Sequence, residues 1–212
     1  MLFRSELNAV MIYSLSFIGL FVIGGLTGLY LSSLAMDVHL TATYFVVAHF
    51  HYIMVGATVS AYFAGLHFWW PKFTGRMYPE TWAKFAAVLM FFGFNLTFFP
   101  QFIAGYLGMP RRYHVYPPEF QVWNVLSSSG AAVLAAAYLM PLGYLTWSLF
   151  FGARAVNDPW NAAGLEWRTT SPPPRDNFVG RPAVLGKPYN YHPEGAVPLQ
   201  DQPRVPSQGL LT

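Results

Sequence analysis

Only 10% of the 212 residues are charged, whereas 54% are hydrophobic and 18% are aromatic. Soluble globular domains carry about a quarter charged residues, so this composition excludes an ordinary soluble domain and indicates a membrane protein. Cysteine is absent, which excludes disulfides, iron–sulfur clusters and thiolate-bound zinc. The net charge of +3 comes without a basic run, so no nucleic-acid partner is expected.

Four long stretches contain no Asp, Glu, Lys or Arg, namely residues 9–34, 44–70, 85–107 and 122–151. Each is longer than the roughly 20 residues that a helix needs to cross the hydrocarbon core. They are also too long and too continuously apolar for the strands of a membrane barrel, which have about ten alternating residues. We therefore expect an all-α membrane protein with four transmembrane helices at about 9–34, 44–70, 84–107 and 122–151, in a membrane region over residues 1–152.

The second predicted helix contains two histidines, His49 and His51, near its outer end. Ionisable residues at membrane depth are uncommon and are usually functional. Positions i and i+2 of a helix point about 200° apart, so the two imidazoles cannot chelate one ion and could instead hold two separate cofactors. Their heights along the helix would differ by only about 3 Å, which suits two haems side by side, with Phe50 near the gap.

A simpler interpretation of the same pair remains open. Histidines inside a membrane can be structural residues that form hydrogen bonds with neighbouring helices. The spacing of His49 and His51 does not by itself decide between this interpretation and cofactor binding.

The loop between the third and fourth predicted helices carries an adjacent pair, Arg111 and Arg112. This pair could be a solvated turn, because Met109 and Pro110 end the helix. It could also bind haem propionates at the outer surface, because guanidinium groups match carboxylates bidentately and keep their charge.

The remaining basic residues near the membrane lie on the opposite side from this pair: Arg4, Lys72, Arg76, Lys84, Arg154 and Arg168. The positive-inside rule therefore places both termini and the loop 71–83 in the cytoplasm. The loops 35–43 and 108–121 are then the outer ones.

The last segment, residues 153–212, is rich in proline and glycine and includes the run Ser171-Pro172-Pro173-Pro174. It has no helical periodicity and too few apolar residues for a core of its own. We expect an extended cytoplasmic tail with local polyproline conformation, lying on the helices or on a partner.

Several motifs together resemble one family. The run Thr43–Tyr52 (TYFVVAHFHY) resembles the tenth-helix signature of the largest subunit of haem-copper terminal oxidases. The later motifs resemble that family's eleventh helix, the loop after it, the start of its twelfth helix and the tail of its bacterial members: Asn95–Gln101, Gly108–Tyr113, Trp123–Ser128, Asp158–Trp160, Leu165–Trp167 and Ser171–Pro174. The chain thus resembles the C-terminal third of subunit I, helices nine to twelve of a twelve-helix bundle.

The resemblance implies particular roles. His49 would ligate the iron of a high-spin haem and His51 that of a low-spin haem, with Phe50 between the haems and Arg111 and Arg112 on their propionates. Two haems are implied, with type a as the expectation, and a copper ion in the complete subunit whose ligands lie outside this chain.

One pair of residues departs from the family pattern. Family members usually have His-Asp before the Thr-Tyr pair, and these residues help to bind magnesium. Here the two positions are Thr41 and Ala42. Loss of the carboxylate removes a hard oxygen ligand that Mg²⁺ favours, so no magnesium ligand is assigned.

The other four histidines are expected to have no ligand role. His39 is interpreted as a loop residue, His67 as an interfacial polar anchor, His114 as a water-facing or propionate-contacting residue, and His192 as a tail residue without a catalytic part.

The resemblance also implies a function. The complete enzyme would reduce O₂ to water with electrons from cytochrome c, coupled to proton translocation in a bacterial inner membrane; the alternative electron donor is a quinol. Its partners would be the preceding eight helices, other subunits such as the copper-carrying subunit II, cytochrome c and lipid. This chain alone is expected to be incomplete and inactive, whether Met1 begins a truncated gene or a split subunit.

Two other classes remain as alternatives. One is a non-catalytic two-haem membrane protein that transfers electrons. The other is a transporter fragment whose histidines relay protons.

Overall fold

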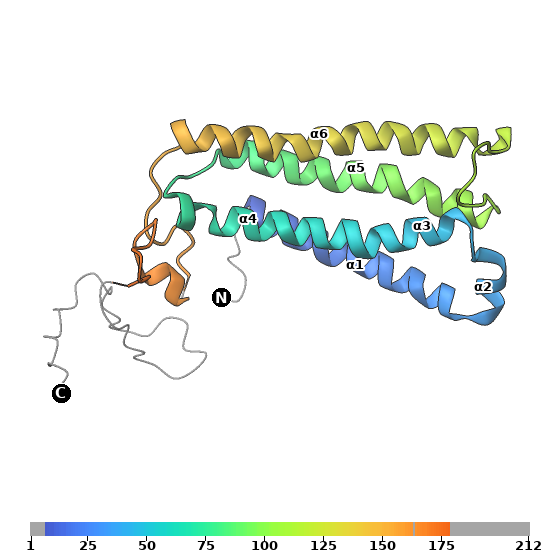
Figure 1. The fold of residues 1–212 in the computed structure, drawn as a ribbon, viewed down its shortest axis with the longest axis horizontal. Helices are drawn as coiled ribbons and strands as arrows, with labels where there is room; N and C mark the ends of the chain where they lie inside the picture. The colour runs from blue at the N-terminus through green and yellow to red at the C-terminus, as the bar shows by residue number, and fades with distance from the viewer. Residues whose placement is uncertain (1–6, 163, 179–212) are drawn as a thin grey trace, which may run out of the picture. The chain divides into compact units, whose positions relative to one another are not determined.

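The computed structural model describes residues 7–162 and 164–178, and within them it is predominantly helical. The α-helices are α1 (Ala9–Ser32), α2 (Leu34–Leu40), α3 (Tyr44–Phe50), α4 (Thr58–Thr74), α5 (Glu80–Tyr106) and α6 (Gln121–Phe151). A π-helix, η1 (His51–Ala57), joins α3 to α4, and two short 3₁₀ helices are η2 (Pro118–Phe120) and η3 (Leu165–Arg168). Figure 1 shows the long helices running side by side along one direction.

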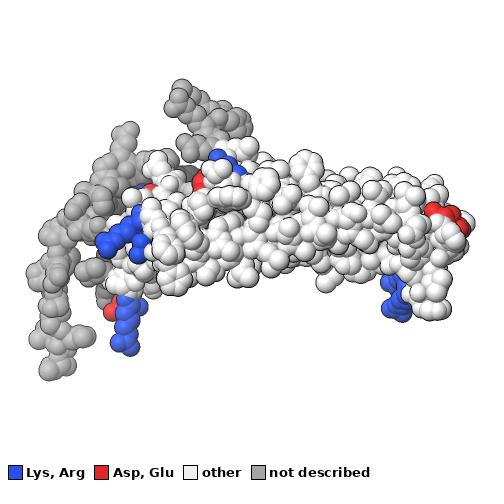
Figure 2. All heavy atoms as spheres, turned by 90° about the horizontal axis from the view of Figure 1, so that it is seen from above, with Lys and Arg blue, Asp and Glu red and all other residues white. Residues whose placement is uncertain are grey.

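Four helical stretches are long and apolar enough to cross a membrane: Ala9–Ser32, Tyr44–Thr74, Glu80–Tyr106 and Pro118–Phe151. Their mean hydropathies are 2.1, 1.3, 1.6 and 1.6 in that order. The predicted class, an all-α membrane protein with four transmembrane helices, is confirmed. In Figure 2 the middle of the helices is white on the face drawn, because the charged side chains gather toward their ends.

The observed helix ends differ from the predicted ones for identifiable reasons. The first long helix stops at Ser32 rather than at Leu34, because Ser33 has an extended backbone and closes the helix through a hydrogen bond to the Tyr30 carbonyl. The third long helix begins at Glu80 rather than at residue 84, because charged residues can occupy the first turn of a helix. The second continues to Thr74 through Pro71.

The contacts divide the described part of the chain into two compact units, one made of residues up to 68 with 79–147 and the other of residues 69–78 with those from 148 on. The first unit is built around α3, η1 and α5, and α1 packs against all three. Its core is apolar and aromatic, and includes Tyr13, Leu20, Tyr52, Met90, Phe94 and Leu134.

Two glycines let helices of this unit approach closely. A β carbon at Gly105 of α5 would overlap the backbone nitrogen of Phe45 in α3, and one at Gly130 of α6 would overlap that of Thr97 in α5. Neither backbone can move aside as a side chain could, so glycine sets the distance between these helices.

The second unit links the end of α4 to the first part of the tail. The Met77 N–H donates to the Ala153 carbonyl at 2.8 Å, and the Ala155 N–H donates to the Gly75 carbonyl at 2.9 Å. The expected extended tail is thus paired along its first residues, and it contains η3 further on. The rest of the tail, from residue 179 on and including His192, lies outside the described residues.

Candidate functional site

The His49 imidazole lies on the side of α3 that faces α1. Its Nδ1 is 3.0 Å from the Gly24 carbonyl oxygen and 3.2 Å from Oγ1 of Thr27. A β carbon at Gly28 would stand 3.0 Å from Cε1 of the ring, so α1 can pass this close only because position 28 has no side chain. The ring is held by hydrogen bonds and contact with one neighbouring helix.

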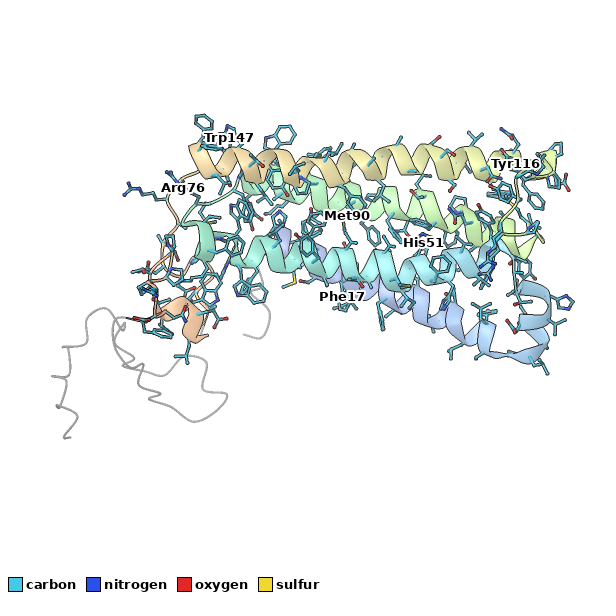
Figure 3. All side chains as sticks on the ribbon, viewed as in Figure 1. Phe17, His51, Arg76, Met90, Tyr116 and Trp147 are labelled. Carbon is cyan, nitrogen blue, oxygen red and sulfur yellow. The ribbon has the colours of Figure 1, made fainter. Side chains whose placement is uncertain are left out.

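The His51 imidazole is held differently, between two aromatic rings. Figure 3 shows it on the side of its helix that faces α5. It stacks on Phe98 of α5 at 4.3 Å between ring centroids and on Phe50 at 4.5 Å. Its Nδ1 is 2.8 Å from the Val47 carbonyl oxygen, one turn back in the same helix. The two histidines therefore contact different helices, α1 for His49 and α5 for His51.

His51 is also the first residue of the π-helix η1. Single turns of π-helix often occur at functional sites, because the extra residue changes the direction of the side chains around it. Gly56 lies within this turn, and a β carbon there would stand 2.7 Å from the Phe94 ring. Apart from this glycine, no sequence pattern marks the π-helix, so the sequence could not predict it.

Both imidazoles leave the same nitrogen available. A carbonyl oxygen can only accept a hydrogen bond, so Nδ1 of each ring carries the proton and Nε2 carries the lone pair. Among the described residues, no partner occupies Nε2 of His49 or of His51. This is the usual arrangement of a metal-ligating histidine, whose other nitrogen donates to a carbonyl that fixes tautomer and orientation, so both residues fit an axial haem ligand.

His67, in α4, provides a contrast within the same membrane-spanning stretch Tyr44–Thr74. Its side chain is fully buried, Nδ1 is 2.7 Å from the Phe63 carbonyl and Nε2 is 2.6 Å from the Tyr144 hydroxyl. Both ring nitrogens are thus engaged, and the ring packs against Tyr13 at 5.1 Å. Because the ring is buried between helices, the expectation of an interfacial anchor was wrong. The sequence could not show this, since Tyr144 lies 77 residues away and only the fold brings it near.

The arginine pair is tied by backbone hydrogen bonds to the start of α3. The Arg111 N–H donates to the Ala42 carbonyl at 2.9 Å, and the Tyr44 N–H donates to the Met109 carbonyl at 3.0 Å. Arg112 has a left-handed backbone with φ of 62°. Within the described ranges neither guanidinium group forms an ion pair with an acidic side chain, and both stay free to meet an anionic group.

Two tyrosines beside this loop, Tyr44 and Tyr113, belong to a hydrogen-bonded set that no sequence pattern predicts. The Tyr44 hydroxyl donates to the Tyr113 hydroxyl at 3.2 Å, which donates to Oδ1 of Asn124 at 3.3 Å. Asn124 in turn donates to the Phe120 carbonyl at 2.9 Å. These bonds join the first residues of α3 and α6 to the loop that carries the two arginines.

The two positions that depart from the family's magnesium-binding pattern, Thr41 and Ala42, also lie at this end. Ala42 has a positive φ of 60°, and Thr41 and Ala42 are both exposed. In the part of the chain that the structure describes, no three side chains of His, Cys, Asp or Glu come together. Thr41 supplies a hydroxyl but no carboxylate at these positions.

The fold and the histidine pair define an integral membrane helix bundle that presents two imidazoles on one membrane-spanning helix. The family described as "Cytochrome C and Quinol oxidase polypeptide I" matches residues 2–133, and the chain belongs to this family. The resemblance inferred from the sequence motifs is thereby confirmed.

Relatives at high identity agree with this membership. The chain is 45% identical over 188 residues to cytochrome c oxidase subunit 1 of Synechocystis sp., which covers 89% of this chain and 34% of the relative. It is 47% identical over 180 residues to the same subunit of Cereibacter sphaeroides, covering 84% and 32%. The heme-copper oxidase subunit I+III of Aeropyrum pernix is 47% identical over 165 residues, covering 77% and 20%.

A solved structure, the cryo-EM structure of a heme-copper terminal oxidase dimer, shares the fold with a TM-score of 0.62 at 23% identity. The likeness covers 70% of this chain and 27% of the solved one. The chain spans about a third of the length of its subunit 1 relatives.

Proposed function

We propose that this chain supplies one axial ligand to each of the two haems of a respiratory oxidase that reduces O₂ to water. His49 would bind the iron of the high-spin haem and His51 that of the low-spin haem, each through Nε2. The observation that supports this most directly is the shared anchoring of the two rings. Each donates from Nδ1 to a carbonyl, and the two lie against different helices.

The bound groups would supply electron transfer through the low-spin haem and oxygen reduction at the high-spin haem with its copper partner. Type a haem is the proposed kind. The copper ligands would come from helices outside this chain. The chain itself would orient the imidazoles, exclude water around them and keep Nε2 deprotonated.

Arg111 and Arg112 would pair with the haem propionates. Guanidinium groups bind carboxylates bidentately, and the loop is held rigidly by its bonds to Ala42 and Tyr44. Phe50 would lie between the two haems, since it follows His49 and precedes His51. In the structure its ring stacks on that of His51.

We further propose cytochrome c as the electron donor and proton translocation as the coupled process. The family includes both cytochrome c and quinol oxidases, and the relatives above that are subunit 1 proteins are cytochrome c oxidases. The enzyme would need the remaining helices of subunit I, the copper-carrying subunit II and a bacterial inner membrane. Both termini would be cytoplasmic, and the arginine loop would face outward.

Ligand variants in the assembled oxidase test the assignment. His51→Ala should remove the low-spin haem absorption while carbon monoxide still binds the other haem, and His49→Ala should do the reverse. His39→Ala, in the short helix α2, is the matched control and should change neither signal. If either His51→Ala or His49→Ala kept both haem spectra intact, the assignment would be wrong.

A further inference from the structure

The environments of the two proposed ligands differ in kind. Two hydrogen-bond acceptors on α1 hold His49, and none of its aromatic neighbours in the described chain stacks on the ring. His51 has a single hydrogen bond to its own helix and two stacked phenyl rings. The plane of the His51 ring is therefore fixed mainly by aromatic packing.

The two phenyl rings lie on opposite faces of the His51 imidazole. Phe98 is 4.3 Å away with an interplanar angle of 19°, and Phe50 is 4.5 Å away with an angle of 29°. Two rings that are both stacked this closely cannot share one face, because they would occupy the same space. A rotation of the imidazole about its bond to Cβ would drive its edges into both phenyl rings.

Phe98 is itself held in place by its neighbours. It packs on Phe94 at 4.7 Å, and Phe94 is buried against Gly56, which has no side chain to displace it. One turn away, the Tyr52 hydroxyl donates to Oδ1 of Asn95 at 2.8 Å and joins η1 to α5 at this level. The Phe98 ring is thus packed within α5 and against His51, whereas Phe50 directly precedes His51 in the chain.

From this geometry we propose that Phe98 is a positioning residue that fixes the plane of the His51 imidazole and so sets the electronic state of the low-spin haem. The inference rests on the proposed function, because it requires His51 to be an axial ligand. The direction of an axial imidazole plane determines how the iron d orbitals split, so a single fixed plane gives one sharp low-spin signal. A freed ring gives a distribution of planes.

The test compares three substitutions in α5 of the assembled oxidase. Phe98→Leu removes the flat face but keeps an apolar side chain, Phe98→Tyr keeps the ring, and Phe102→Leu makes the same change one turn away. Phe102 is a suitable control, because its ring is buried and packs on Phe45 and Tyr52. Haem content is measured by absorption, and the ligand geometry is measured by low-temperature EPR of the oxidised enzyme.

Phe98→Leu should keep both haems but broaden the low-spin EPR line and shift its largest g value. Phe98→Tyr and Phe102→Leu should leave that line at its native position and width. An unchanged line in Phe98→Leu with normal haem content would overturn the inference and leave the ligand assignment standing. Persistence of the low-spin line in His51→Ala would instead overturn the proposed function.

A folding defect can be separated from these outcomes. If Phe98→Leu does not assemble, Phe98→Met provides a flexible, unbranched side chain that fills gaps in cores. It should give the same broadened and shifted line, and a native line in this variant would equally contradict the role of Phe98.

Discussion

Gly28 of α1 lies directly against the imidazole of His49: a β carbon at position 28 would stand 3.0 Å from Cε1 and 3.7 Å from Nε2. The nitrogen proposed to bind iron is thus within reach of any side chain added at this position. The glycine-containing segment of α1 is therefore part of the site, although it carries no ligand itself.

Gly28→Ala should displace the His49 ring and weaken its bond to the haem iron. Overpacking of this kind costs about 1–3 kcal/mol. We expect a shifted iron–histidine stretching band in the resonance Raman spectrum of the high-spin haem, with the low-spin haem unaffected. Gly25→Ala is the control on the same helix, since a β carbon there meets nothing within 4 Å among the described residues. Equal spectra for the two variants would show that Gly28 does not restrain the ring.

Gly105→Ala should separate α3 from α5. The added β carbon would overlap the Phe45 backbone nitrogen and stand 2.6 Å from the Tyr44 carbonyl carbon. Because these are backbone atoms of the helix that carries His49, the expected loss of stability is about 3 kcal/mol or more. Thermal unfolding in detergent, followed by circular dichroism, measures it. Gly143→Ala on α6, where the β carbon has open space in the described structure, should unfold at nearly the native temperature.

The sequence predicted the long helices well, because their apolar stretches are continuous and charges interrupt them clearly. It also predicted that His49 and His51 would point different ways, since that follows from the helical repeat alone. It could not predict which helices the rings would meet. The contacts of His49 with Gly24 and Thr27, and of His51 with Phe98, depend on how α1 and α5 pack.

Buried polar partners escaped prediction for the same reason. The Tyr144 hydroxyl bonded to His67 and the bonds from Tyr44 through Tyr113 to Asn124 join residues far apart in sequence. No local sequence pattern marks such pairs. A histidine or tyrosine next to tryptophans is equally compatible with an interfacial position and with a buried one. Only the packing of the helices distinguishes them.

The hydrogen bond between His67 and Tyr144 should contribute modestly to stability. His67→Phe and Tyr144→Phe each remove the hydrogen bond between these two side chains, and hydrogen bonds between membrane helices contribute about 0.6 kcal/mol, up to about 1.7. A double-mutant cycle by reversible unfolding in mixed micelles should give a coupling energy in this range. Because both ring nitrogens of His67 are engaged, neither substitution should alter the haem spectra, and a lost haem signal would contradict the structural role assigned here.

Lys72 should hold the first part of the tail in the second unit. Its side chain is buried, and Nζ donates to the carbonyls of Asn157 at 3.0 Å and Thr169 at 2.9 Å while lying 5.0 Å from the centre of the Trp167 ring. Lys72→Met keeps the apolar stem and removes the charge. Hydrogen bonds from charged groups contribute about 1.5–3 kcal/mol, so cleavage of the tail by chymotrypsin should speed up roughly tenfold or more.

Two further lysine variants serve as controls for the cleavage rate. Lys84→Met removes a lysine from α5 and should leave the cleavage rate near its native value. Lys72→Arg should protect only in part, because a planar guanidinium group cannot direct its N–H bonds as an ammonium does. A native cleavage rate in Lys72→Met would show that other contacts hold the tail.

Arg111→Gln and Arg112→Gln should lower the midpoint potential of the low-spin haem. A cation near the propionates disfavours loss of an electron from the iron, so removing it favours the oxidised state. Two unit charges about 4 Å apart at an effective dielectric near 20 interact by roughly 4 kcal/mol, and the iron would lie farther from the arginines, so the shift in its potential should correspond to a fraction of that energy. Arg111 is half-buried and Arg112 is exposed, so Arg111→Gln should have the larger effect because water screens Arg112 more strongly.

Redox titration of each variant measures the shift in midpoint potential. Arg111→Lys should fall between native and Arg111→Gln, because it keeps the charge but loses the bidentate geometry. Unchanged potentials in both glutamine variants, at normal haem content, would show that the pair is a solvated turn.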